Sequence, residues 1–177
     1  ILEDESILKI GQNIKFDYII LKNLGINIKN MDDTMLMSYV LRSGLRGHNL
    51  DELSLDFLSY STQKFAEVAT VEKKKVTFDY VDVKIAMNYA AEDSDVTFRL
   101  WEILKLELIK NKLYEFYFYI EKPLIEIIAL MEINGCKINN NHLTKLSNEF
   151  SKKIKLIEEK IYKLCGAQFN IGSPKQL

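Results

Sequence analysis

The chain has 177 residues, of which 47% are hydrophobic, so it is long enough for one domain with a real core and part of another. Its formal net charge of −1 is not that of a general polyanion binder. Two distant cysteines do not make a disulfide framework or a metal knuckle, and the sequence shows no transmembrane-length apolar run and no signal peptide, which favours a reducing, cytoplasmic setting.

The first forty residues predict an α/β arrangement. Ile7–Gly11 is a short β-rich run, and a helix is expected after it, with Asn13 near its start and Gly25 as its stop. Ile26–Ile28 is predicted to form a second strand and Thr34–Leu41 the next helix. This is the part of the chain to which the β signal is confined.

The middle of the sequence predicts less regular structure. A loop containing Gly44 and Gly47 leads into an expected helix over Leu50–Leu58. Ser59–Thr77 has no strong periodicity and is interpreted as an exposed excursion, with the Lys73–Lys75 run as a solvated loop.

Lys84–Lys112 is predicted to be one long helix. Six apolar residues fall on one stripe at a 3.6-residue period: Ile85, Tyr89, Val96, Leu100, Ile103 and Leu104. Charged residues lie opposite: Glu92, Asp95, Arg99 and Glu102. Asp93 lies inside the stripe, where a carboxylate is costly unless a charged or hydrogen-bonding group meets it. A metal ion is one candidate, and a Lys or Arg from elsewhere is the other.

The remainder is predicted to be helical. Tyr114–Asn134 is an apolar helix with a kink or restart at Pro123, and Gly135 ends it. A brief extended segment, Cys136–Ile138, leads into the amphipathic helix Asn141–Leu164.

Charge and the last residues suggest how the chain is organised. Residues 136–177 hold eight Lys and three Glu, whereas the preceding part carries 16 basic and 22 acidic residues. Two functional surfaces, or two ordinary solvated faces, would both give this pattern. Ser173–Leu177 has the pattern of a helix N-terminus, with Ser173 as the N-cap and Pro174 at the first helical position. We therefore expect the sequence to be a segment of a longer protein.

Asn13 and Asp17 form a second informative pair. They share one predicted helix face with Ile20 and Leu24, and they follow directly after a strand. The crevice at strand carboxyl ends is where ligands bind in α/β folds. The alternative is a first-turn Asp favoured by the helix dipole, with Asn13 as the N-cap.

Together these segments resemble a known family. Asn13-Ile14-Lys15-Phe16-Asp17 and Tyr89-Ala90-Ala91-Glu92-Asp93 resemble the second and third motifs of the DEDDy 3′–5′ exonucleases. Further stretches resemble the proofreading domain of the bacterial family A DNA polymerases and the entry to their polymerase domain: Lys9–Asp17, Asp33–Leu36, His48–Asp51, Glu121–Leu124, Asn134–Ile138 and Phe169–Leu177.

The resemblance implies an α/β, incomplete ribonuclease H-like 3′–5′ exonuclease fold followed by an all-helical segment. Residues 1–112 would be the later part of the exonuclease domain, and residues 113–177 the connector helix and first thumb helices of the polymerase. The family's first motif, an Asp-x-Glu on a strand, is absent, and with it the leading strands. We therefore expect the parent to be a proofreading enzyme of DNA replication and repair, and this segment alone to be inactive.

The resemblance also assigns roles. Asp93 and Asp17 would hold two divalent ions, Mg²⁺ or Mn²⁺, with Asp93 at the ion that activates water, and Tyr89 would orient the attacking water. Asn13, Met35 and Phe78 match substrate-side positions: Asn13 would support Asp17, and the other two would contact the terminal nucleotide of DNA. Plain core is the alternative for Met35 and Phe78.

One departure and two rival functions remain. Family members commonly place Arg directly before the motif His, whereas here Gly47 precedes His48 and Arg46 lies one residue earlier. The rivals are a non-catalytic scaffold that keeps the exonuclease fold and an RNA-trimming DEDDy enzyme. The four matching residues argue against the scaffold, and the polymerase-like end of the chain argues against RNA trimming.

Overall fold

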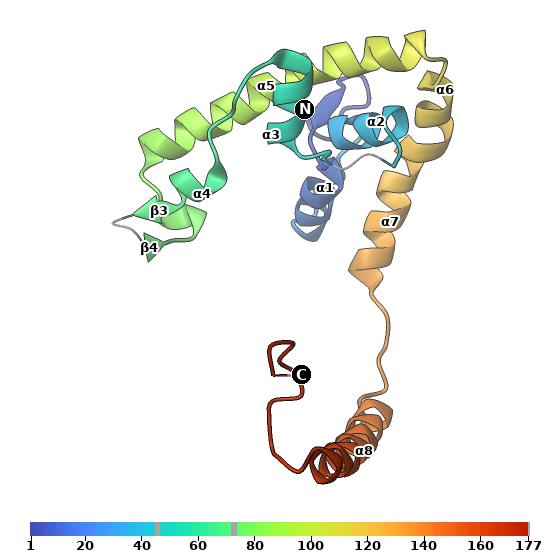
Figure 1. Ribbon diagram of the computed structural model, residues 1–177. Coiled ribbons are helices and arrows are strands. Elements are labelled where there is room, and N and C mark those ends of the chain that lie inside the picture. The colour runs from blue at the N-terminus through green and yellow to red at the C-terminus, as the bar shows by residue number, and fades with distance from the viewer. Residues whose placement is uncertain (45–46, 72–73, 177) are drawn as a thin grey trace. The chain divides into compact units, whose positions relative to one another are not determined.

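The computed structural model describes residues 1–44, 47–71 and 74–176. The chain forms two compact units, Ile1–Asn134 and Gly135–Leu177, whose elements are labelled in Figure 1. Arg46 and Lys73, which the sequence pointed to beside Gly47 and in the Lys73–Lys75 run, lie outside the described residues. The first unit is mostly helical with small two-stranded sheets, so the helical, weakly β character expected from the sequence is confirmed in outline.

A short parallel sheet lies at the start of the first unit. Strand β1 (Lys9–Gly11) pairs with β2 (Met31–Asp33), and helix α1 (Ile14–Asn23) connects them. The strand predicted at Ile26–Ile28 is wrong, because the second strand begins only after Asn30, whose φ of 51° turns the backbone. The acidic residues of β2, Asp32 and Asp33, are buried, and each is stabilised by polar or charged partners within the fold.

Asp33 joins two helices to this sheet. Its Oδ1 accepts the backbone N–H groups of Asn13 and Met35, both at 2.9 Å, and its Oδ2 accepts that of Ile14 at 3.0 Å. The carboxylate therefore caps helix α2 (Thr34–Leu41), whose predicted bounds are confirmed, and also holds the beginning of α1. Burial raises the pKa of Asp33, and these backbone donors act in the opposite direction.

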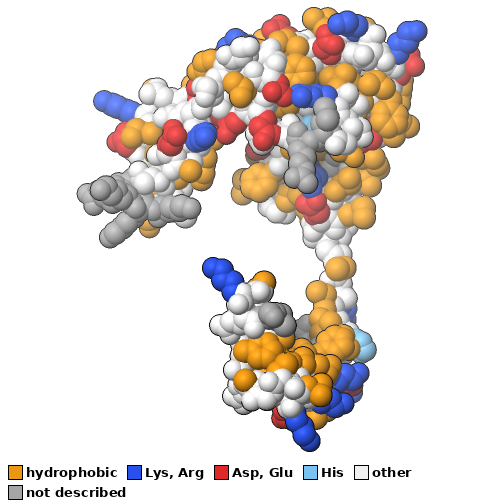
Figure 2. Space-filling model, viewed as in Figure 1, with side chains coloured by type: hydrophobic (Ala, Val, Ile, Leu, Met, Phe, Trp, Pro, Cys, Tyr) orange, Lys and Arg blue, Asp and Glu red, His pale blue; other side chains and the backbone are white. Residues whose placement is uncertain are grey.

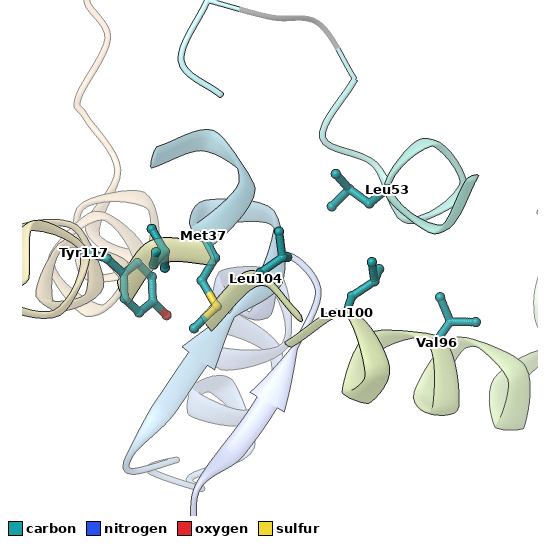
Figure 3. Close-up of a cluster of buried hydrophobic side chains, with 7 residues drawn as sticks. Met37, Leu53, Val96, Leu100, Leu104 and Tyr117 are labelled. Carbon is teal, nitrogen blue, oxygen red and sulfur yellow. The ribbon is translucent and has the colours of Figure 1, made fainter. Parts of the chain in front are cut away.

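The main core forms along the second half of helix α5 (Val83–Lys110), as Figure 3 shows. Its fully buried members come from α2, α5 and two further helical segments: Met37, Leu53, Val96, Leu100, Leu104, Leu108 and Tyr117. The predicted stripe is wrong for the first half of the helix, where Ile85 is 46% exposed. That half extends past the core and packs on the short helix α4 (Phe65–Val68).

The middle segment is more structured than predicted. Helix α3 (Leu50–Leu53) continues as the π-helical turn η1 (Ser54–Leu58). The two together span the predicted helix Leu50–Leu58. The predicted exposed excursion contains α4 and an antiparallel pair, followed by a short helix: β3 (Thr70–Val71), β4 (Lys74–Lys75) and the 3-10 helix η2 (Phe78–Tyr80). Lys74 and Lys75 are thus in a strand rather than in a loop.

The last helices of the first unit turn back onto α1. Their bounds are α6 (Tyr114–Phe116), the π-helical turn η3 (Tyr117–Glu121) and α7 (Lys122–Asn134). The π-helical turn ends just before Pro123, where the sequence predicts a kink or restart. Lys15 of α1 forms an ion pair with Glu132, and the Tyr18 hydroxyl donates to Glu126 at 2.9 Å. These contacts fix α7 against the helix that carries Asp17.

The second unit contains helix α8 (Asn140–Cys165), close to its predicted bounds. The Asn139 side chain caps it, and Gly166 ends it with a φ of 72°. Hydrophobic and Lys side chains lie on different sides of α8 in Figure 2, and exposed hydrophobic residues include Leu143, Phe150, Ile154, Ile157 and Leu164. Ser173–Gln176 forms a turn.

Both cysteines are exposed and free. Across the described ranges 1–44, 47–71 and 74–176, no helix is long and apolar enough to cross a membrane.

Candidate active site

A pocket of about 470 Å³ brings the predicted catalytic side chains together. Its walls come from the end of β1 and from α1, α3 and α5. Asp17, Tyr89 and Asp93 all line it, together with Asp51 from the first turn of α3. Figure 2 shows acidic side chains gathered where α3 and the first half of α5 lie. Helices far apart in the sequence therefore supply carboxylates to one cavity.

Asp93 and Tyr89 lie one helical turn apart on α5, and both are half-buried. Burial raises the pKa of Asp93, and the charges of Glu92 and Asp51 raise it further, while Tyr89 lowers it. Burial, followed by the charge of Asp93, raises the pKa of the Tyr89 hydroxyl to about 12. The hydroxyl therefore keeps its proton at neutral pH and can donate it in a hydrogen bond.

Asp17 projects from α1, near the end of β1. The residue is exposed as a whole, yet partial burial of its carboxyl raises the pKa. Asp17 and Asp93 thus line the same pocket, and partial burial disfavours the charged form of both carboxyl groups. Raised carboxylate pKa values of this kind are common at functional sites.

Asn13 precedes α1 in a left-handed conformation, with a φ of 57°. Asn13 is the N-cap residue of α1 and Asp17 lies in its first turn, as the alternative predicted, although the Asn13 side chain makes no capping hydrogen bond. The backbone N–H of Asn13 donates to Asp33 instead. Asn13 is therefore placed at the junction that sets the direction of α1 and the position of Asp17.

The two expected nucleotide contacts lie in different surroundings. Phe78 is 40% exposed, and its ring centroid lies 6.0 Å from that of Tyr89. Met35 is half-buried in the first turn of α2 and does not line the pocket. Phe78 is thus beside the candidate site, and Met35 is not in its wall.

Two residues at this site were not singled out from the sequence. Asp51 belongs to the His48–Asp51 stretch, but its carboxylate gave no sign of facing the pocket. Phe65 lies in the segment taken for a loop, and its ring centroid is 6.1 Å from that of Tyr89 and 6.0 Å from that of Phe78. Both residues lie in helices of only four residues, α3 and α4, which are too short to give a clear periodic signal.

The donors present suit a hard divalent ion, although they are few. Within the described residues, no group of three or more His, Cys, Asp or Glu side chains has metal-binding geometry. Mg²⁺, however, is commonly held by one or two carboxylates together with substrate phosphates. Asp17 and Asp93 supply that number of carboxylates to one pocket.

Comparison with known proteins fits this geometry. Residues 1–109 match the family model described as 3′–5′ exonuclease, which defines the class of the first unit. The whole chain is 47% identical to a DNA polymerase I of Rhizobium leguminosarum and 42% identical to one of Pseudomonas aeruginosa. The chain therefore belongs to the 3′–5′ exonuclease family of DNA polymerase I, and these relatives are enzymes. It spans 17% and 20% of their lengths.

The fold also has a solved counterpart. The chain aligns with a TM-score of 0.73 and 24% identity to the POL domain of Pol1 from M. smegmatis, solved in complex with DNA primer-template and dNTP. The alignment covers 98% of this chain and 27% of that one. At this identity the likeness establishes the fold.

Proposed function

We propose that this chain is part of a DNA polymerase I and contributes to its proofreading 3′–5′ exonuclease, which hydrolyses the 3′-terminal phosphodiester of DNA. The observation that carries the proposal is that Asp17, Tyr89 and Asp93 line one pocket. The family match over residues 1–109 supports the reaction class. DNA replication and repair in the cytoplasm would be its setting.

In this proposal Asp93 and Asp17 hold divalent ions, Mg²⁺ or Mn²⁺, through their carboxylate oxygens. When bound, such ions stabilise the charge on the attacking and leaving oxygens of phosphodiester hydrolysis. Tyr89, protonated at neutral pH, orients the attacking water through its hydroxyl. The α/β fold would be the later part of a ribonuclease H-like domain, with further strands and an Asp-x-Glu motif supplied by preceding sequence.

The substrate would be a single-stranded 3′ end. Phe78, whose ring is partly exposed beside Tyr89, would stack on the terminal base without regard to sequence. Met35 would contact the same nucleotide from α2, and Asn13 would keep Asp17 in place.

The second part of the chain would serve duplex DNA. We propose that residues 1–112 belong to the exonuclease and residues 113–177 to the connector and first thumb helices. Helix α8 carries six of its unit's eight Lys residues, and Lys–phosphate contacts would bind the duplex backbone. The resemblance at Phe169–Leu177 favours a polymerase over an RNA-trimming enzyme.

A substitution series in the longer polymerase polypeptide tests this function. Asp93→Asn and Asp17→Asn should each lower 3′-nucleotide release from single-stranded DNA by at least about 100-fold, because each removes a charge that holds an ion. Asp95→Asn, on the exposed side of the same helix, is the matched control. Polymerase activity reports folding. Full exonuclease activity in Asp93→Asn would remove Asp93 from the proposed site, whereas no activity in the unaltered polypeptide would support the non-catalytic scaffold.

A further inference from the structure

Glu92 makes two hydrogen bonds that its predicted place on the solvent side of α5 does not suggest. Its Oε1 accepts from the Tyr60 hydroxyl at 2.6 Å, and its Oε2 accepts from the backbone N–H of Gln63 at 2.9 Å. Both donors belong to residues 59–64, the segment that joins η1 to α4. Glu92 therefore holds this segment against the helix that carries the catalytic pair.

A second anchor attaches the same segment to the pocket wall. The Thr62 hydroxyl donates to Oδ1 of Asp51 at 2.6 Å, and Thr62 is only 7% exposed. The segment is thus attached to α5 on one side and to α3 on the other. Movement of this segment would therefore strain hydrogen bonds to both helices.

The segment ends where three aromatic rings meet. Phe65 directly follows it, and its ring lies edge-to-face with that of Tyr89. Phe78 contacts both rings. Aromatic contacts of this kind have preferred geometries, so the place of Phe65 constrains the orientation of the Tyr89 ring and hence of its hydroxyl.

We propose that Glu92 is a positioning residue that acts on the reaction through Tyr89. By holding residues 59–64 it sets Phe65 against the Tyr89 ring, which aims the hydroxyl beside Asp93. The inference rests on the proposed role of Tyr89 in orienting water. It gives the two neighbouring acids of the Glu92-Asp93 pair different tasks: Asp93 faces the pocket, and Glu92 fixes the aromatic ring that works with it.

The test is a double-mutant cycle in the longer polymerase polypeptide, measured as exonuclease kinetics on single-stranded DNA. Glu92→Ala should lower kcat about tenfold with KM within about twofold, because water alignment is lost while substrate contacts stay. In a Tyr89→Phe background, Glu92→Ala should have no further effect on kcat. Glu92→Gln keeps an acceptor oxygen and should restore most of the loss. Glu102→Ala, exposed on the same helix, should leave kcat unchanged.

Hydrogen exchange at the Gln63 amide gives a readout that needs no activity. Glu92→Ala should speed this exchange by about tenfold or more, and Glu92→Gln should keep it slow. The inference is wrong, while the proposed function stands, if Tyr89→Phe lowers kcat and Glu92→Ala lowers it further by its full factor in that background. The same holds if Glu92→Ala changes neither kcat nor the exchange rate of the Gln63 amide. An unchanged kcat in Tyr89→Phe would overturn the proposed role of Tyr89 and the inference with it.

Discussion

The Nζ of Lys122 lies 2.8 Å from Oδ1 of Asp32, and this ion pair joins the first residue of α7 to the buried strand β2. The two side chains are 18% and 5% exposed. Trp101 Nε1 donates to the same carboxylate at 2.8 Å, and the Tyr117 hydroxyl lies 3.2 Å from it. One buried charge therefore connects the sheet, α5 and α7.

Loss of the Lys122 charge should be costly. Lys122→Met should lower the free energy of unfolding by about 3 kcal/mol, because it leaves Asp32 charged and buried without its cation. Urea unfolding measures the change. Lys110→Met is the matched control, since its pair with Glu107 is exposed and worth under about 1 kcal/mol. The double variant Asp32→Asn/Lys122→Met should recover part of the loss. Equal effects of Lys122→Met and Lys110→Met would rule out a structural role for the buried pair.

Asp93→Asn should raise the thermal midpoint of the metal-free chain by about 2 °C at pH 7. Burial raises the folded-state pKa of Asp93 above 3.8, so its charge disfavours the folded state once the pH exceeds that folded-state pKa. Below the unfolded value both states are protonated, and the difference between the variant and the natural chain should vanish. Calorimetry at pH 7 and pH 3 measures this, with EDTA present.

The control for that measurement is Asp95→Asn, because Asp95 is exposed and lies 3.4 Å from Arg99. Its replacement should not raise the midpoint. If Asp93→Asn leaves the midpoint unchanged or lowers it, Asp93 already has a stabilising partner within the protein.

Gly11→Ala should destabilise the chain by about 1–3 kcal/mol. A Cβ at Gly11 would lie 2.9 Å from Cβ of the buried Ile14, so α1 would have to move, and Asp17 with it. Gly172→Ala should be nearly neutral, because its nearest neighbour is Asn170 Oδ1 at 3.4 Å. Chemical denaturation compares the two. Similar losses from both replacements would show that the space beside Gly11 is not limiting.

The 177-residue chain by itself should release no nucleotides from single-stranded DNA with Mg²⁺ or Mn²⁺. The proposed two-ion site would need more carboxylates than Asp17 and Asp93, and the 177 residues contain no Asp-x-Glu sequence to supply them. The assay follows labelled 3′ ends on a gel. Activity that disappears in Asp93→Asn would prove the two carboxylates sufficient.

Local sequence patterns predicted some elements well and others poorly. Thr34–Leu41 and the long amphipathic helices have clear periodicity and caps, and they form where expected. Strand β2 was missed because Asp32 and Asp33 look unsuited to a buried strand. Their partners Trp101, Tyr117 and Lys122 are distant in the sequence, and only the folded chain supplies them.

The candidate site shows the same division. Asp17, Tyr89 and Asp93 could be found because each belongs to a short motif on a helix. Asp51 and Phe65 could not, since only the folded chain shows that Asp51 of α3 lines the pocket and that Phe65 lies beside Tyr89. Glu92 was placed on the solvent side by helix periodicity, which describes the direction of a side chain but not the loop that covers it.

The double use of Asp33 has a kinetic consequence. The same carboxylate accepts backbone N–H groups at the start of α1 and of α2, so neither helix can fray at that end without loosening the other. Their first turns should open as one cooperative unit, with matched exchange of the Ile14 and Met35 amides. The first turn of α1, which bears Asp17, would then be either fully folded or fully open, without a partly ordered state.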